Sequence, residues 1–374
     1  MNKPLYQMIY EKVKHEIKTG KYDVGHQIPT EKQLMELFDV SRLTAKNAMN
    51  LLVEEGWITR IPGKGSFVSE EVKGKIVTKK SDLVGVILAG FSDSYGAELL
   101  RATISYLNEK GFQCILKISN ESQELETEYL NELISLGVRG IIILPVQAEY
   151  HNQALLKITL SNFPIVLMDR KLFGLSVPYV GSNNKAIANQ MVNKLIELGH
   201  QNISVVSHKH LNNSSVSDRI EGIKEAYYNN TMVLDNSMWL LNLETSYSNR
   251  INEACLERDF ESIHKKIKEH QNITCFFALD YFSGQIVWNA LSKLGKKIPE
   301  DYSLIGFDGP VDHSLTTSFS RIIQNQEAIA KHAVDLLAQL VHSIEVDKKE
   351  VIVEARFIDD HTILHDKTKV VLSL

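Results

Sequence analysis

The sequence predicts an α/β protein in which a short helical head precedes a long body of parallel sheets arranged in two lobes. Seven apolar runs recur between residues 84 and 307, and helical stretches separate them, which is the pattern of buried parallel strands. Three short amphipathic helices and two short strand-like runs occupy the first 69 residues. A chain of 374 residues with 44% hydrophobic residues is long enough for two or three domains.

The head begins with two predicted helices. In residues 4–19 an apolar residue recurs at every fourth position, which indicates an amphipathic helix that Gly20 closes. The second helix begins within "IPTEKQLMELF", where Thr30 and Gln33 have the spacing of a capping box. Its expected buried stripe consists of Leu34, Leu37 and Phe38. The residues "DV" then leave only a very short connection to a third helix.

The stretch "VSRLTAKNAMNLLVEEGW" (residues 40–57) predicts a third helix with two different faces. Ser41 can cap this helix from its hydroxyl, and Gly56 can end it in a left-handed conformation. The apolar face, which is expected to pack, contains Ala45, Ala48, Met49 and Leu52. The opposite face carries Arg42, Lys46, Asn47 and Asn50. That polar face is either an ordinary solvated surface or a row of side chains that contact bases and phosphates.

The residues that follow the third helix favour nucleic-acid contact. "WITRI" and "SFV" are strand-like, and the turn "PGKG" between them places Lys64 at the tip of a hairpin. Two helices, a tight turn, a third helix and a hairpin form a winged helix-turn-helix, although short helices joined by tight turns also occur in modules that never touch DNA. Residues 1–80 carry 14 basic and 10 acidic side chains, a net charge of +4, whereas the remainder carries −9. We therefore predict that residues 1–69 bind DNA.

The stretch "PTEKQLMELFDVSRLTAKNAMNLLVEEGWITRIPGKGSFV" resembles the DNA-binding module of the GntR regulators almost without gaps. The resemblance implies that the third helix enters the major groove and that the wing, the hairpin, reaches toward the minor groove. It also implies DNA contacts at Glu31, Arg42, Thr44, Lys46, Gly63 and Lys64. To these we add Ser41 and Asn47, which belong to the same helix region.

These expected contacts differ in their chemistry. Arg42 has the guanidinium fork that reads guanine O6 and N7, so we assign it base readout. Lys46 stands where the family commonly has arginine, and as a point charge it suits a phosphate at least as well. Asn47 has the amide that can read adenine, although an exposed asparagine on a helix usually reads nothing. Glu31 either reaches a cytosine amino group or favours the start of its helix through the macrodipole.

The body follows a charged stretch without clear period, residues 70–82, which is predicted to be a linker. Residues 83–365 alternate strands with helices for too long to form one sheet of usual size, so two doubly wound lobes are expected. Ligands of such sheets bind beyond the carboxyl ends of the strands. Those ends carry Phe91, Asp93, Tyr95, Asp169, Arg170, Asp280, Tyr281 and Asp308, a set that suits a hydroxyl-rich ligand. Asp169 and Asp308 could equally cap the segments that follow them.

The body also resembles a family, the periplasmic-binding-protein-like effector domain of the LacI-type regulators. The matching stretches include "GVRGIIILPV", "PIVLMDRK", "LIELGHQNISVVS", "RIEGI" and "IPEDYSLIGFDG". The resemblance implies a type I two-lobed sensor with effector contacts at Phe91, Tyr95, Asp169, Arg170, Arg219, Asp280, Asp308 and Gln324. Two departures matter: Leu279 stands where the family often has asparagine, and Gly309 where it often has a second aspartate. Leu279 cannot make the expected amide hydrogen bond, so the ligand can differ.

A GntR-type head on a LacI-type body is the combination found in the arabinose-responsive repressors of Gram-positive bacteria. By this analogy the effector is L-arabinose, a related pentose or its oligomer, and the protein represses when empty. One head reads few base pairs, so we expect a homodimer on a palindromic or pseudo-palindromic operator, with the heads about 34–36 Å apart. A regulator of the same architecture that responds to a phosphorylated or non-sugar effector is the alternative. A solute-binding protein is a weaker one.

Other functional classes find no support in the sequence. It contains no G-x-G-x-x-G after a strand, no phosphate-binding loop and no G-x-S-x-G, so we expect neither an enzyme nor a cofactor. His208 and His210 alternate in "SHKHL" but lack a third ligand, so no metal site is expected. The three cysteines, Cys114, Cys255 and Cys275, are far apart, which indicates a reduced compartment without disulfides. Neither a signal peptide nor a membrane-length apolar run is evident, so a cytoplasmic location is expected.

Overall fold

The computed structural model divides the chain into two compact units, the head (Met1–Asp82) and the body (Leu83–Leu374). The structure describes residues 4–18, 21–70, 82–146, 152–172, 174, 177–209, 213–245, 252–310, 319–344, 346 and 349–365. Most of the predicted linker, residues 71–81, lies outside these ranges. Within them, no helix is long and apolar enough to cross a membrane.

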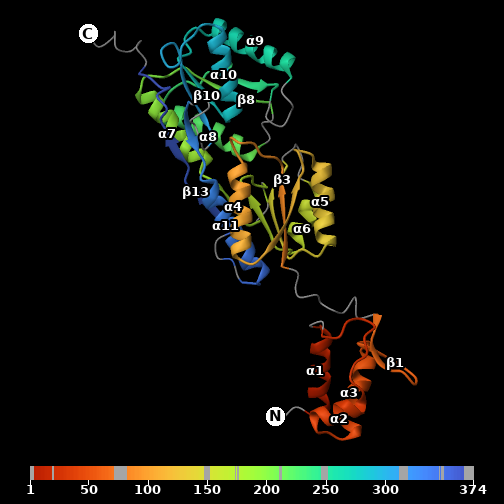
Figure 1. Cartoon of the computed structure of the whole chain (residues 1–374). Coiled ribbons are helices and arrows are strands. Elements are labelled where there is room, and N and C mark those ends of the chain that lie inside the picture. The colour runs from red at the N-terminus through yellow and green to blue at the C-terminus, as the bar shows by residue number, and fades with distance from the viewer. Residues whose placement is uncertain are drawn as a thin grey trace. The chain divides into compact units, whose positions relative to one another are not determined.

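The head has the predicted order of three helices and an antiparallel hairpin (Figure 1). Its elements are α1 (Leu5–Lys18), α2 (Glu31–Phe38), α3 (Arg42–Glu54), β1 (Ile58–Ile61) and β2 (Gly65–Val68). The capping box is confirmed, because Gln33 N donates to Thr30 Oγ1 at 3.3 Å and Thr30 N donates to Gln33 Oε1 at 2.8 Å. Ser41 caps α3 by accepting a hydrogen bond from Thr44 N at 3.2 Å. These caps fix where α2 and α3 begin, and so fix the turn between them.

The predicted packing face of α3 is confirmed, since all four of its apolar residues are buried in the core of the head. The stripe predicted for α2 is partly wrong, because Leu37 is 72% exposed while Leu34 is buried. Met35 and Phe38 pack beside Leu34 against the same core. Because successive residues are 100° apart around a helix, Leu34, Met35 and Phe38 define a packing face that does not include Leu37.

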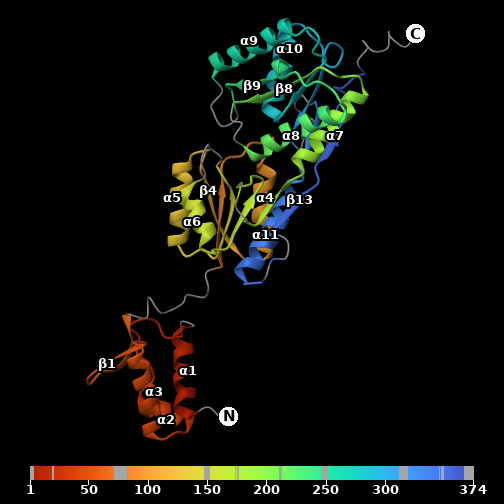
Figure 2. The same ribbon diagram turned by 180° about the vertical axis from the view of Figure 1, so that it is seen from behind.

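The first lobe of the body is a six-stranded parallel sheet in the order β13-β7-β6-β5-β3-β4. Its strands are β3 (Leu83–Leu88), β4 (Gln113–Ile118), β5 (Ile141–Leu144), β6 (Ile165–Met168), β7 (Tyr179–Ser182) and β13 (Glu350–Val353). Its helices are α4 (Ala97–Glu109), α5 (Gln123–Ser135), α6 (Gln153–Leu160) and α11 (Gln326–Val341). Helices α4 and α11 cover one face of the sheet and α5 and α6 the other, as both views show (Figures 1 and 2).

The second lobe repeats this plan with the strand order β14-β12-β11-β10-β8-β9, in which only β14 runs antiparallel to its neighbour. Its strands are β8 (Ile203–His208), β9 (Leu240–Leu243), β10 (Cys275–Ala278), β11 (Ser303–Phe307), β12 (Ser320–Ile323) and β14 (Arg356–Ile358). Its helices are α7 (Asn184–Glu197), α8 (Ser214–Asn229), η2 (Asn236–Met238), α9 (Glu253–Glu269) and α10 (Tyr281–Lys293). The predicted two-lobed, doubly wound arrangement is confirmed.

The chain passes between the lobes three times, after β7, after β12 and after β13. Two of the crossings are tied together by Asn183, whose N donates to Val353 O at 3.1 Å and whose Oδ1 accepts from Ala355 N at 2.9 Å. Each lobe is therefore assembled from segments that are far apart in the sequence.

One carboxyl group in the first lobe is fully buried. Glu126, on α5, accepts hydrogen bonds from Val146 N at 2.7 Å and from Asn152 Nδ2 at 2.9 Å. Burial raises the pKa of Glu126 to about 7, although both hydrogen bonds act in the opposite direction. Between about pH 4.5 and pH 7, the folded body therefore holds a proton on Glu126 that the unfolded chain releases.

We predict that the contribution of Glu126 to the stability of the body falls as the pH rises from about 4.5 to about 7, because over this range the unfolded chain releases the proton that the folded body still holds. The variant Glu126→Gln cannot ionise and should flatten this part of the pH profile. Urea unfolding across this range measures the slope, and Glu128→Gln, an exposed change on the same helix, is the matched control. Equal slopes for Glu126→Gln and the unaltered protein would contradict the prediction.

Candidate nucleic-acid interface and effector site

The polar face of α3 is solvent-exposed in the structure. Arg42 is the first residue of the helix, and Arg42, Lys46 and Asn47 are all exposed, whereas Thr44 is half-buried. Residues four apart lie on the same side of a helix, so Arg42 and Lys46 are directed alike. The buried opposite face holds this row outward.

The hairpin is held close to the start of α2. Arg60 Nη2, on β1, donates to Glu31 Oε1 at 3.1 Å, so Glu31 has an ion-pair partner within the wing. Sequence reasoning missed Arg60, which is exposed on β1. At the turn, Gly63 has a φ of +73°, and exposed Lys64 accepts through its carbonyl oxygen from Gln27 Nε2 at 3.0 Å. These contacts orient the wing as a unit.

In the body, Arg219 of α8 is the centre of a buried polar cluster. Its Nε donates to Asn184 Oδ1 at 2.9 Å, its Nη1 donates to the carbonyl oxygen of Leu279 at 2.5 Å, and its Nη2 lies 3.7 Å from Asp308 Oδ2. The guanidinium also stacks over the ring of Phe307, 3.9 Å from its centroid. Arg219 is only 4% exposed. Its orientation is therefore fixed by four different groups.

Further predicted residues lie around Asp308, the carboxylate that faces Arg219. Gln324 Nε2 donates to Asp308 Oδ1 at 2.8 Å, and the charges of Asp169, Asp308 and Arg219 all act on the buried phenol of Tyr95. Burial raises the pKa of Asp308 to about 6 despite the opposing charge of Arg219, and burial with Asp169 raises the pKa of Tyr95 well above its ordinary value. The structure thus brings together five of the eight predicted effector contacts.

Several polar atoms of this cluster are buried and, within the described residues, have no partner at normal hydrogen-bond geometry, although Asp169 lies close enough to act on the Tyr95 hydroxyl. Two of these groups can donate, the Tyr95 hydroxyl and Asn184 Nδ2, and two can accept, Asp169 Oδ1 and Gln324 Oε1. Asp169 and Asp308 both adopt left-handed backbone conformations with φ near +66°, at the ends of β6 and β11. Unpartnered buried polar atoms and strained strand ends both cost stability, and both are typical of ligand sites.

Of the remaining predicted contacts, Arg170 and Asp280 belong to a second group of charged residues, and Phe91 belongs to neither group. Arg170 makes a bidentate ion pair with Glu121, at 2.8 and 3.0 Å, and His208 Nδ1 lies 3.2 Å from Asp280 Oδ2. Burial alone would lower the pKa of His208, but the hydrogen bond to Asp280 and the negative charge of Asp280 together outweigh burial, so the pKa is raised. Phe91 is not buried with either group, since it is 40% exposed on the loop after β3.

His208 has a carboxylate partner in Asp280, and His210 lies outside the described residues. Sequence reasoning missed Asn184, Glu121 and the pairing of His208 with Asp280, because no local pattern shows which loops adjoin at the strand ends.

Three hydrogen bonds join the two lobes around the cluster. Gly309 N donates to Ser94 O at 3.1 Å, Ser215 Oγ donates to Asp169 O at 3.0 Å, and Lys171 N donates to Ser214 Oγ at 2.9 Å. Since the strand ends of both lobes contribute to one buried cluster, a ligand held there would contact both lobes at once.

The structure explains one of the two departures from the family pattern, the glycine at position 309. Leu279 is buried, and it holds Arg219 through its backbone carbonyl. Gly309 has a φ of +142°, and a Cβ there would lie 2.9 Å from the side chain of Arg321, which is itself buried and ion-paired with Asp360. Glycine is thus required at position 309 by both its conformation and its surroundings.

We predict that Gly309→Asp, the residue common in the family, lowers the free energy of unfolding by about 1–3 kcal/mol. Thermal or urea unfolding measures the loss. Gly295→Asp is the matched control, because Gly295 also has a positive φ, of +66°, but open space around it. A loss at position 309 no larger than at position 295 would show that Arg321 adapts to the added side chain.

Comparison with known proteins agrees with this geometry. Residues 5–68 match the family of bacterial regulatory proteins of the gntR type, and residues 84–343 match the periplasmic binding protein domain family. The chain is 24% identical to an arabinose metabolism transcriptional repressor of Geobacillus stearothermophilus, over 92% of this chain and 93% of that one. It is 25% identical to a ribose operon repressor of Halalkalibacterium halodurans, over 74% and 83% of the two chains.

Solved structures share the fold of the body. A LacI family regulator from Enterococcus faecium with bound ribose superposes with a TM-score of 0.63 at 23% identity, covering 76% of this chain and all of that one. The transcription regulator CcpA of Lactococcus lactis gives a TM-score of 0.65 at 20% identity, covering 75% and 98%. The chain is therefore a transcriptional regulator with a gntR-family head, and its body belongs to the family of periplasmic binding protein domains that LacI-type regulators share.

Proposed function

We propose that the protein is a repressor that leaves its operator when a small neutral sugar binds between the lobes. The observation that carries this proposal is the set of buried donors and acceptors without partners beside Arg219 and Asp308. Each sugar hydroxyl both donates and accepts a hydrogen bond, so a polyol can satisfy the Tyr95 hydroxyl, Asn184 Nδ2, Asp169 Oδ1 and Gln324 Oε1 together.

The charges of the site favour a neutral ligand over a phosphorylated one. Each cation in it faces a carboxylate: Arg219 faces Asp308, Arg170 faces Glu121, and His208 faces Asp280. Asp169 adds a further buried carboxyl group. A phosphate of charge −1.5 to −2 would therefore enter a site without surplus positive charge. Two of the similar proteins are named as arabinose and ribose repressors, so we favour a pentose, and L-arabinose is our first candidate.

In the head, we propose that Arg42 reads a base and that Lys46 and Lys64 contact phosphates, with Glu31, Ser41, Thr44, Asn47 and Gly63 at the same interface. A homodimer on a palindromic operator, acting in the cytoplasm, would supply the specificity that one head lacks. Linkage then requires the sugar and the operator to weaken each other's binding by one common factor, typically about 5–150-fold.

The first test is thermal unfolding of the purified protein with L-arabinose, D-ribose and D-ribose 5-phosphate. A sugar at about a hundred times its dissociation constant stabilises the fold by about 2.7 kcal/mol. Stabilisation by a free pentose, together with release of DNA selected from a random pool, supports the proposal. Failure of every free sugar to stabilise the protein or to release that DNA would overturn it.

A further inference from the structure

The second group of charged residues in the effector site comprises Arg170, Glu121, His208 and Asp280. His208 ends β8 and Asp280 follows β10, which pairs with β8, so both lie at the carboxyl ends of strands in the second lobe. Arg170 and Glu121 belong to the first lobe, yet their charges act on His208. The charge of Asp280 also acts on Asp308, the partner of Arg219. The second group therefore lies beside the buried cluster and is built from both lobes.

Asp280 is engaged by residues of its own lobe. Its Oδ1 accepts a hydrogen bond from Ser283 N at 2.8 Å, which caps α10. Its Oδ2 accepts a second from Ser283 Oγ at 2.6 Å and lies 3.2 Å from His208 Nδ1. Most of the hydrogen-bonding capacity of this carboxylate is therefore used within the second lobe.

The contact with Asp280 determines how the imidazole of His208 presents its two nitrogens. An ionised carboxylate only accepts hydrogen bonds, so Nδ1 must carry the proton between them, and Nε2 points away from Asp280. The side chain of His208 is 13% exposed, so the ring is not sealed in the core. The hydrogen bond and the charge of Asp280 raise the pKa of His208 despite burial, which favours the imidazolium form. In that form Nε2 is a donor as well.

We propose that His208 donates a hydrogen bond from Nε2 to an oxygen of the bound sugar, and that Asp280 positions the imidazole for this contact. The inference rests on the proposed function. A sugar hydroxyl accepts such a bond, and a hydrogen bond from a charged donor is roughly twice as strong as one between neutral groups. The family resemblance assigns the sugar contact to Asp280 itself, whereas here the contact passes through a histidine.

A simpler role for His208 is to neutralise the buried carboxylate of Asp280. That role requires Nδ1 alone, whereas the proposed role requires Nε2 as well. Asparagine at position 208 places its amide about where the imidazole has Nδ1, and glutamine places its amide about where the imidazole has Nε2. The two roles therefore predict different results for these two substitutions.

The test is titration calorimetry of the full chain with L-arabinose and D-ribose between about pH 6 and about pH 8. We expect His208→Asn to weaken the binding of the sugar about tenfold, and His208→Gln to retain most of the affinity. The imidazolium is present below the pKa of His208, which lies above the ordinary value of 6.5. The affinity of the unaltered protein should therefore fall as the pH rises through that pKa, and His208→Gln should lack this part of the fall.

Asp280→Asn tests the positioning role. Asparagine also caps helices well, so α10 should keep its start, but the charge that raises the pKa of His208 is lost. The fall in sugar affinity should then begin at a lower pH than in the unaltered protein. The charge of Asp280 also raises the pKa of Asp308, and the double variant Asp280→Asn/His208→Gln measures the part of the shift that belongs to Asp308.

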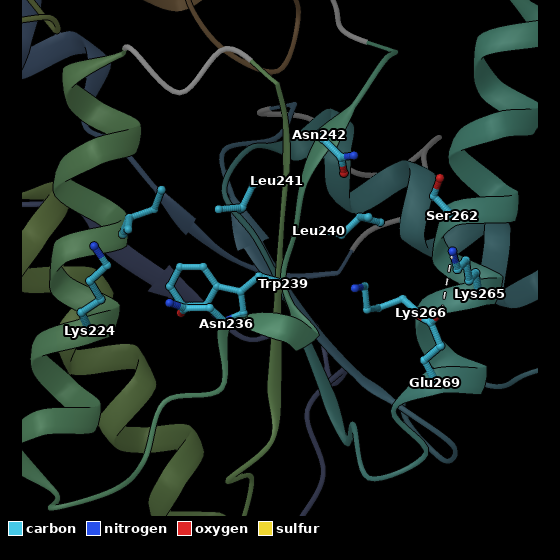
Figure 3. Close-up of a pocket in the computed structure, with 11 residues that line it drawn as sticks. Lys224, Asn236, Trp239, Leu240, Leu241, Asn242, Ser262, Lys265, Lys266 and Glu269 are labelled. Atoms are coloured by element: carbon cyan, nitrogen blue, oxygen red, sulfur yellow. Dashed lines mark ion pairs between the residues drawn. The ribbon is translucent and has the colours of Figure 1, made fainter.

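His264→Asn is the matched control, because it removes a histidine of the same lobe from another place. His264 lies on α9, which borders a separate cavity of about 740 Å³ between α8 and α9 (Figure 3). The described residues that line this cavity include none of the eight predicted effector contacts. The control should therefore leave the sugar affinity and its pH profile unchanged. Thermal unfolding of each variant without sugar checks that it is folded.

Three results would overturn the inference. The first is a sugar that binds His208→Asn as tightly as it binds the unaltered protein. The second is a pH profile of His208→Gln identical to that of the unaltered protein. The third is binding of neither pentose by the unaltered protein, in which case the proposed function fails as well. The first two results leave the proposed function intact, so the two failures can be told apart.

Discussion

The variant Arg219→Ala is expected to bind operator DNA normally and to ignore the sugar at every concentration. Arg219 is held by Asn184, Leu279 and Asp308. Its removal deletes the group around which the buried polar atoms are arranged. Gel shift with and without sugar, together with sugar titration by calorimetry, measures both halves of this expectation.

One control variant separates loss of binding from loss of folding. Truncating one partner of a buried ion pair costs about 3–5 kcal/mol, because Asp308 would be left without its cation. Arg219→Lys keeps the charge but cannot reach all three partners as a fork, so it should fold better than Arg219→Ala and still bind the sugar poorly. Normal induction in either variant would remove Arg219 from the effector site.

The second large effect is expected at Arg42. Its replacement by alanine should weaken binding to the cognate operator by about 1–3 kcal/mol and relax the preference at one base pair. Arg42 is exposed at the first position of α3 and lies outside the buried core of the head, so folding should be unaffected. Competition binding against a library of single-base operator variants gives both quantities.

Lys46→Ala is the matched comparison on the same face of α3. A lysine that contacts a phosphate should lose affinity on all sequences alike, and the slope of log K against log salt should fall by about 1. If Arg42→Ala behaves in this way instead, Arg42 contacts the backbone and base readout belongs elsewhere on the helix.

The parts of the fold that could be predicted are those in which local sequence and burial agree. The seven predicted strands are continuous apolar runs because both faces of a parallel sheet are covered by helices. The strands that were missed are β7, β9, β12, β13 and β14. β9, β13 and β14 escaped prediction because they are edge strands, in which side chains of mixed polarity are tolerated. β7 escaped it because its sequence, "YVGS", contains residues that usually indicate a turn.

The site was predictable only as a set of strand ends. Asp169 and Asp308 follow buried strands, so the rule for open α/β sheets places them at the ligand edge. Their partners depend on how distant loops meet, which no single segment encodes. Asn184 reaches Arg219 from the start of α7, and Glu121 reaches Arg170 from the loop after β4. Such contacts are decided by tertiary structure.

The three crossings between the lobes also set the order in which the protein can become functional during synthesis. The head, Met1–Asp82, has a hydrophobic core of its own and is complete as soon as it leaves the ribosome. The first lobe still needs α11 and β13, and the second needs β12 and β14, all of which come from residues 320–358. A chain that stops before residue 320 would therefore carry a folded DNA-binding head with no working sensor. Under the proposed function, such a product could occupy DNA but could not be released by sugar.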